Sequence, residues 1–94
     1  MTSLNLPSKI ILSDDVLFQE VGEETILLNM QTEQYFGLNF VGTRIWQLLS
    51  SDGDAEKALQ VLSQEYKADE TTLRTDLELL LHELADKKLI SIEN

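Results

Sequence analysis

The chain has 94 residues, 43% of them hydrophobic and 26% charged, and its 17 acidic and 7 basic side chains give a formal net charge of −10. A chain of this length predicts one domain with a modest core. The negative charge disfavours nucleic acid and anionic membranes as partners, because their phosphates would be repelled. Cysteine is absent, which excludes disulfides, thiolate metal sites and cysteine nucleophiles.

Targeting and membrane-spanning signals are not found in the sequence. The N-terminal stretch lacks the basic region and apolar run of a secretory signal, and no segment approaches the roughly 18 apolar residues of a membrane span. We therefore expect a cytoplasmic protein with a single domain over residues 1–94, in which residues 1–14 form a loose lead-in. Within that lead-in, Lys9–Leu12 either pairs as a short strand or stays loose.

The first half of the chain has the pattern of β-strands. VLFQEV (16–21) and ETILLNM (24–30) flank a glycine turn at Gly22, which predicts an antiparallel hairpin. EQYFGL (33–38) predicts a third strand, in which Tyr35 and Phe36 point to opposite faces. The three strands are expected to form a small meander.

The second half of the chain has the pattern of three α-helices, over about 41–51, 55–66 and 69–88, and residues 89–92 are a candidate terminal strand. Each helix has an Asn or Asp at its start that suits an N-cap. The third helix carries an apolar stripe formed by Leu73, Leu77, Leu80, Leu81 and Leu84. This order of elements predicts an α+β fold of winged helix-turn-helix shape, with a three-stranded antiparallel sheet followed by three helices.

Residue patterns for catalysis are weak. The only histidine, His82, lies within a predicted helix, and the serines and glycines form no nucleophile or phosphate-binding motif. Glu78 and His82 are four residues apart, a spacing that suits a metal, but two ligands without a third make a weak site. We therefore expect no enzyme activity, no metal and no cofactor.

A winged-helix shape is compatible with several functions other than catalysis. DNA binding by a regulator is disfavoured, because the third helix carries more acidic than basic side chains. Peptide or protein recognition is favoured, because an open sheet edge can accept a guest strand. Leu79 lies outside the leucine stripe and is either a single exposed leucine or part of a second contact surface. A purely structural subunit of an enzyme complex is a further alternative.

Three ordered motifs carry a resemblance to a known family. They are YFGLNFVGTRIWQLL (35–49), L-x-x-E-Y (62–66) and D-L-x-x-L-L-x-x-L (76–84). Together they resemble the PqqD-like proteins, also called precursor peptide recognition elements of ribosomally synthesised, post-translationally modified peptides (RiPPs). The resemblance covers about residues 15–92.

The resemblance implies a non-catalytic adaptor. In the family, the leader segment of a precursor peptide adds as a strand to the third β-strand, lies against the third helix and is delivered to modifying enzymes. Those enzymes are a leader peptidase and a macrocyclase in lasso peptide synthesis, or a radical SAM enzyme in pyrroloquinoline quinone synthesis. The form Y-x-x-L-N-x-x-G-x-x-I-W is closer to the freestanding lasso-type proteins, with the second pathway as the alternative.

The candidate site lies between the third strand and the third helix. Backbone hydrogen bonds along the strand would set the register, and pockets for alternate side chains would give specificity. Asp76 either pairs with a basic leader residue, holds a backbone amide or is simply solvated. The leucines of the third helix are alternatively ordinary core. The residues assigned to peptide binding are Glu33, Gln34, Tyr35, Phe36, Gly37, Leu38, Leu73, Asp76, Leu77 and Leu80.

Three further expectations concern individual residues near this site. Gly42 is expected to allow the first helix to approach the third strand closely. Trp46 is expected to pack between the sheet and the helices. A Leu38→Pro substitution is expected to weaken leader binding, because proline cannot donate a strand hydrogen bond.

Overall fold

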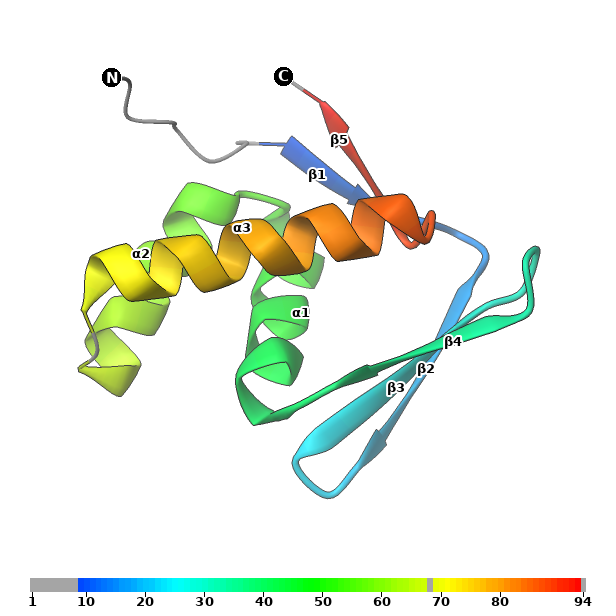
Figure 1. Cartoon of the computed structure of the whole chain (residues 1–94), viewed down its shortest axis with the longest axis horizontal. Coiled ribbons are helices and arrows are strands. Elements are labelled where there is room, and N and C mark those ends of the chain that lie inside the picture. The colour runs from blue at the N-terminus through cyan, green and yellow to red at the C-terminus, as the bar shows by residue number, and fades with distance from the viewer. Residues whose placement is uncertain (1–8, 68, 94) are drawn as a thin grey trace.

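The computed structural model describes residues 9–67 and 69–93 and contains, within them, five strands and three α-helices (Figure 1). In chain order they are β1 (Lys9–Leu12), β2 (Val16–Val21), β3 (Glu24–Asn29), β4 (Gln34–Leu38), α1 (Phe40–Asp52), α2 (Ala55–Tyr66), α3 (Glu70–Asp86) and β5 (Ile90–Glu93). The predicted α+β class, with a three-stranded antiparallel sheet and three helices, is confirmed.

The three-stranded sheet has the order β2-β3-β4, so that β4 is an edge strand. Both pairs are antiparallel, and β3 contributes the buried side chains Thr25, Leu27 and Asn29 on one face. The strand predicted over 33–38 is β4, and it begins at Gln34, one residue later than predicted. Glu33 has a φ of 61° and lies in the turn, where its N–H donates to the Asn29 carbonyl at 2.7 Å.

A second sheet joins the two ends of the described chain, because β1 pairs antiparallel with β5. The N–H of Ile10 in β1 also donates to the carbonyl of Gly53 at 2.7 Å, which ties the strand to the α1–α2 turn. Lys9–Leu12 is therefore a strand rather than part of a loose lead-in. Residues 1–8, also assigned to the lead-in, lie outside the described residues.

The predicted helix caps are confirmed. The Asn39 side chain accepts from the Gly42 N–H at 2.8 Å, and Asp54 and Asp69 make the equivalent bonds at the starts of α2 and α3. Such bonds satisfy backbone donors that have no partner within the helix. α3 ends at Asp86, two residues before the predicted end.

The main hydrophobic core lies between the helices and one face of the three-stranded sheet. Leu27 of β3, Trp46 of α1 and Leu77 of α3 are all buried within it. Trp46 therefore packs as expected. Figure 1 shows α3 passing beside the open edge of β4, with α1 between them and set back. None of the described helices is both long and apolar enough to span a bilayer.

Candidate peptide-binding groove

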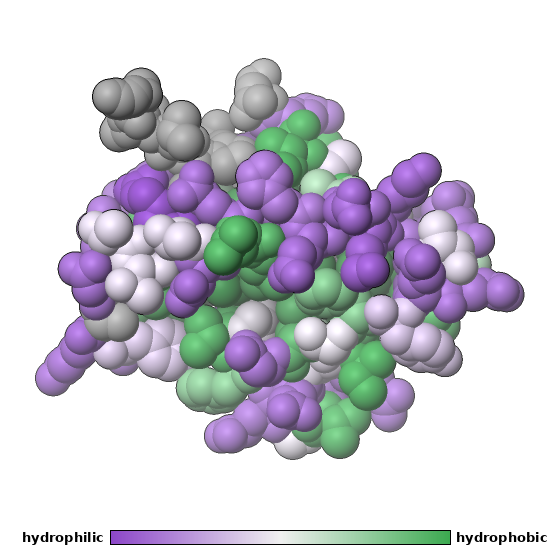
Figure 2. Space-filling model, in the orientation of Figure 1, coloured by the Kyte–Doolittle hydropathy of each residue, from purple (hydrophilic) through white to green (hydrophobic). Residues whose placement is uncertain are grey.

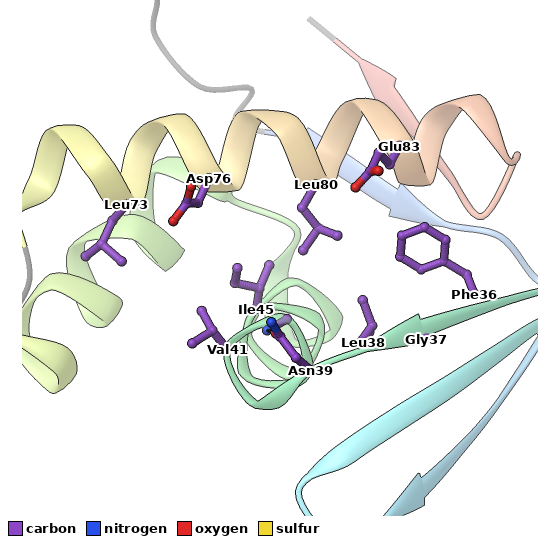
Figure 3. Close-up of a pocket in the computed structure, with 11 residues that line it drawn as sticks. Phe36, Gly37, Leu38, Asn39, Val41, Ile45, Leu73, Asp76, Leu80 and Glu83 are labelled. Atoms are coloured by element: carbon purple, nitrogen blue, oxygen red, sulfur yellow. Dashed lines mark hydrogen bonds between the residues drawn. The ribbon is translucent and has the colours of Figure 1, made fainter.

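A groove of about 530 Å³ lies between β4, α1 and α3. In the orientation of Figure 2, hydrophobic surface is exposed between α3 and the sheet and is bordered by hydrophilic surface. The groove is lined by Phe36, Gly37, Leu38, Asn39, Val41, Gly42, Ile45, Leu73, Asp76, Leu80 and Glu83 (Figure 3). An apolar floor with a few polar groups at its border is typical of a ligand site.

The open edge of β4 presents backbone hydrogen-bonding groups to this groove. The N–H of Met30, which follows β3, donates to the carbonyl oxygen of Asp15, which precedes β2, at 2.8 Å. The backbone groups of Met30 therefore face β2. Because successive residues of a strand bond to opposite neighbours, the even-numbered residues of β3 bond to β2 and the odd-numbered ones to β4. The partners of these odd-numbered residues are Gln34, Phe36 and Leu38, so the backbone N–H and C=O groups of these three residues face β3. The N–H and C=O groups of Tyr35 and Gly37 therefore face the open edge.

The side chains of β4 divide between its two faces. Phe36 is half-buried, lies opposite Leu27 and points into the groove. Tyr35 is 70% exposed on the other face, so the prediction that these two aromatic residues point to opposite faces is confirmed. A Cβ placed on Gly37 would meet no atom within 4 Å. The face of β4 opposite Phe36 is thus open at this position.

Close contact between β4 and α1 depends on Gly42. A Cβ at this position would lie 3.2 Å from Leu38 Cδ2 and 3.3 Å from Asn39 Oδ1, which is tighter than ordinary van der Waals contact. The expected role of Gly42 in close approach is therefore confirmed. Leu38 is only 3% exposed, and it closes the floor of the groove next to Ile45.

The side chains of α3 that border the groove alternate between apolar and acidic. Leu73, Asp76, Leu80 and Glu83 all line the groove. In Figure 3, Leu73 and Leu80 extend from the helix toward α1, and Glu83 lies at the end of the row nearer to Phe36 of β4. No ion pair joins Asp76 or Glu83 to a lysine or arginine of the described residues. The groove therefore presents two carboxylates, and none of the described side chains that line it is basic.

Most of the residues assigned to peptide binding meet in this groove. Phe36, Gly37, Leu38, Leu73, Asp76 and Leu80 line it. Leu77 does not line it and has no exposed surface, because it points from α3 into the core. Glu33 precedes β4 in a turn. Gln34 and Tyr35 belong to β4 but are not among the lining residues.

Sequence reasoning missed several lining residues, among them Val41, Ile45 and Glu83. Glu83 had a detectable signal: it follows Asp76 by seven residues and Leu80 by three, so all three share one face of a helix. The α1 residues had no comparable signal, because their apolar spacing is that of any buried helix face.

The other candidate sites give no support for a metal. Within residues 9–67 and 69–93, no three or more His, Cys, Asp or Glu side chains come together in a way that could hold a metal ion. Leu79 is 60% exposed on α3, which agrees with its position outside the leucine stripe.

These features define an α+β domain whose edge strand and third helix enclose an apolar, acid-bordered groove. A family model described as coenzyme PQQ synthesis protein D (PqqD) matches residues 24–90. A solved structure, TbiB1 in complex with the TbiA(beta) leader peptide, matches with a TM-score of 0.83 and 37% identity, over 89% of this chain and 98% of that chain. The chain belongs to the PqqD family, which confirms the resemblance. Comparison with curated proteins gave no significant match.

Proposed function

We propose that this protein is a non-catalytic adaptor that binds the leader segment of a ribosomally synthesised precursor peptide. The leader adds as a strand to the open edge of β4 and places alternate side chains in the groove beside α3. The observation that carries the proposal is the groove itself, because it joins an unpaired strand edge to apolar pockets. This combination is what recognition by strand addition requires.

Several features support this mode of binding. Tyr35 and Gly37 direct backbone N–H and C=O groups outward, which would fix the register of a guest strand. Phe36, Leu38 and Leu80 offer apolar contacts to side chains on one face of that strand. A relative with 37% identity has been solved with a leader peptide. A leader that is disordered when free would lose conformational entropy on binding, so a preformed groove is an advantage.

The direct experiment is a titration of the protein with leader peptides encoded beside its gene, followed by amide NMR. We expect chemical-shift changes concentrated at residues 34–38 and 73–83. Failure of every neighbouring leader to bind would overturn the proposal. A salt-sensitive gel shift with duplex DNA would instead favour the alternative function of a DNA-binding regulator.

We further propose that the enzymes served are a leader peptidase and a macrocyclase of a lasso peptide pathway. The motif form around Asn39 and Trp46 supports this choice. The alternative is a radical SAM enzyme of pyrroloquinoline quinone synthesis, the pathway that the family description names. We also propose that the protein acts in the cytoplasm and that residues 1–94 form a single recognition domain. Co-purification of the protein with each enzyme from the neighbouring genes, with and without the leader, distinguishes the two pathways.

A further inference from the structure

We propose that Asp76 and Glu83 select the guest strand by the spacing of its basic residues. The preferred peptide has basic residues at positions i and i+4 and an apolar residue at position i+2. The inference rests on the proposed function, because it assumes that a strand occupies the groove. Both carboxylates border the groove on the side of α3, and Leu80 lies between them along the helix (Figure 3).

The spacing follows from the geometry of helix and strand. Asp76 and Glu83 are seven residues apart, which corresponds to about 10.5 Å along the helix axis. A strand rises about 3.3 Å per residue and points alternate side chains to the same face. Side chains two positions apart would be separated by about 6.6 Å and those four apart by about 13 Å. The longer separation fits better, since flexible lysine or arginine side chains absorb the remaining difference.

The apolar position between the two basic residues also follows from the groove. With basic residues at positions i and i+4, the residue at i+2 points to the same face and lies near Leu80. Phe36, Leu38 and Ile45 complete the apolar surroundings there. The pattern basic-x-apolar-x-basic is symmetric, so the inference holds for either direction of the guest strand.

The carboxylates are available for a guest. Arg74, the arginine of α3, is directed elsewhere: its guanidinium lies 2.8 Å from Glu56 and 3.4 Å from Glu70. Among residues 9–67 and 69–93, no lysine or arginine lines the groove. The net charge of −10 would in addition attract a cationic segment at long range. A test must therefore separate local pairing with Asp76 and Glu83 from this general attraction.

Three synthetic nine-residue peptides separate the contributions. The first is TTKTLTKTT, which has the proposed spacing. The second is TTTKLKTTT, which has the same composition and charge but places both lysines on the face opposite the leucine. The third is TTQTLTQTT, without charge. Exposed ion pairs each contribute little, so we expect the first peptide to bind about fivefold more tightly than the second in an amide NMR titration.

Two double variants of the full chain complete the test. Asp76→Asn with Glu83→Gln should abolish the difference between the first two peptides. Glu78→Gln with Asp86→Asn removes the same charge from α3 at residues that do not line the groove, and should preserve the difference. Retention of the difference in the first variant, or its loss in the second, would contradict local pairing.

The outcomes also distinguish this inference from the proposed function. Equal affinities for the three peptides, with shifts at residues 34–38, would overturn the charge selection and leave strand addition intact. Absence of binding by the first peptide, when a neighbouring leader binds, would likewise overturn the charge selection alone. Absence of binding by both the designed peptides and every neighbouring leader would overturn the proposed function.

Discussion

The side chain of Asn29 donates from Nδ2 to the backbone carbonyl oxygen of Lys87 at 3.1 Å, and so joins the end of β3 to the end of α3. The same amide group donates to the Lys88 carbonyl at 3.2 Å, while Oδ1 accepts from the Gln31 and Thr32 N–H groups. One buried side chain thus orders the turn before β4 and anchors α3. Asn29 thereby fixes the distance between β4 and α3, the two walls of the groove, at one end.

This arrangement predicts that substitutions of Asn29 reduce stability. Asn29→Ala leaves partly buried backbone groups without these partners and should lower the free energy of unfolding by about 1–3 kcal/mol. Asn29→Asp should cost more at neutral pH, because a carboxylate would face two carbonyl oxygens. Urea denaturation measures both variants, and the exposed Gln31→Ala serves as the control. A stable Asn29→Asp protein would show that the contacts to Lys87 and Lys88 are dispensable.

A second prediction concerns the outward N–H of Gly37. Gly37→Pro removes this donor, whereas the N–H groups of β4 that face β3 belong to Gln34, Phe36 and Leu38. A Cβ at Gly37 would meet no atom within 4 Å, and proline is tolerated at an edge strand whose N–H faces outward. We expect leader affinity to fall about fivefold to tenfold, the effect of one lost hydrogen bond. Isothermal titration calorimetry checks the result. Gly37→Ala, which keeps the N–H, should bind within about twofold of the original protein, and equal affinities of the two variants would exclude this edge as the docking strand.

Sequence patterns predict much of this fold because they act locally. Strand and helix periodicity, the glycine turn at Gly22 and the caps at Asn39, Asp54 and Asp69 each depend on neighbouring residues. The pairing of β1 with β5 depends instead on segments about 80 residues apart, for which the sequence offers only two short apolar runs. That pairing, and with it the second sheet, required the structure.

The candidate site was only partly predictable for similar reasons. Leu77 and Leu80 belong to the same leucine stripe, and only the packing of α3 decides that Leu77 is core and Leu80 lines the groove. The direction of each N–H on β4 depends on its hydrogen-bonded register with β3. The N–H of Leu38 faces β3, so Leu38→Pro would disturb the sheet itself, and Gly37 is the position that tests the edge.

The division between Leu77 and Leu80 gives a third prediction. Leu77→Ala should lower the free energy of unfolding by about 2–5 kcal/mol, because it opens a cavity in the core. Leu80→Ala should cost less stability but should weaken leader binding, because Leu80 is partly exposed in the groove. Thermal denaturation and peptide titration of both variants separate the two roles. If Leu77→Ala bound the leader more weakly at a temperature where the variant is fully folded, the assignment of Leu77 to the core alone would be contradicted.

A fourth prediction concerns the ion pair between Arg44 and Glu65, whose Nη2 and Oε2 atoms are 2.7 Å apart. The hydrogen bond from Arg44 lowers the pKa of the Glu65 carboxyl below its ordinary value. The pair therefore stabilises the fold above the unfolded-state pKa of Glu65, and this contribution is lost as the pH falls through the lowered pKa. Arg44→Gln should raise the pKa of Glu65, as a carbon-detected NMR titration would show. An unchanged titration would mean that the pair does not persist in solution.

A fifth prediction uses two glycines with similar backbone conformations but different surroundings. Gly22 has a φ of 65° and Gly53 a φ of 72°, so alanine at either site costs about 1 kcal/mol of strain. A Cβ at Gly22 meets nothing within 4 Å, whereas one at Gly53 would overlap the carbonyl oxygen of Ile10. Relief of that overlap requires β1 to move away from the α1–α2 turn.

The expected free energies of unfolding follow from this difference. Gly22→Ala should lose about 1 kcal/mol from strain alone, and Gly53→Ala about 2–4 kcal/mol, because it also disturbs the bond from the Ile10 N–H to the Gly53 carbonyl. Urea denaturation gives the two values, and amide hydrogen exchange at Ile10 should accelerate only in Gly53→Ala. Equal losses in the two variants would mean that the contact between β1 and Gly53 adds nothing to stability.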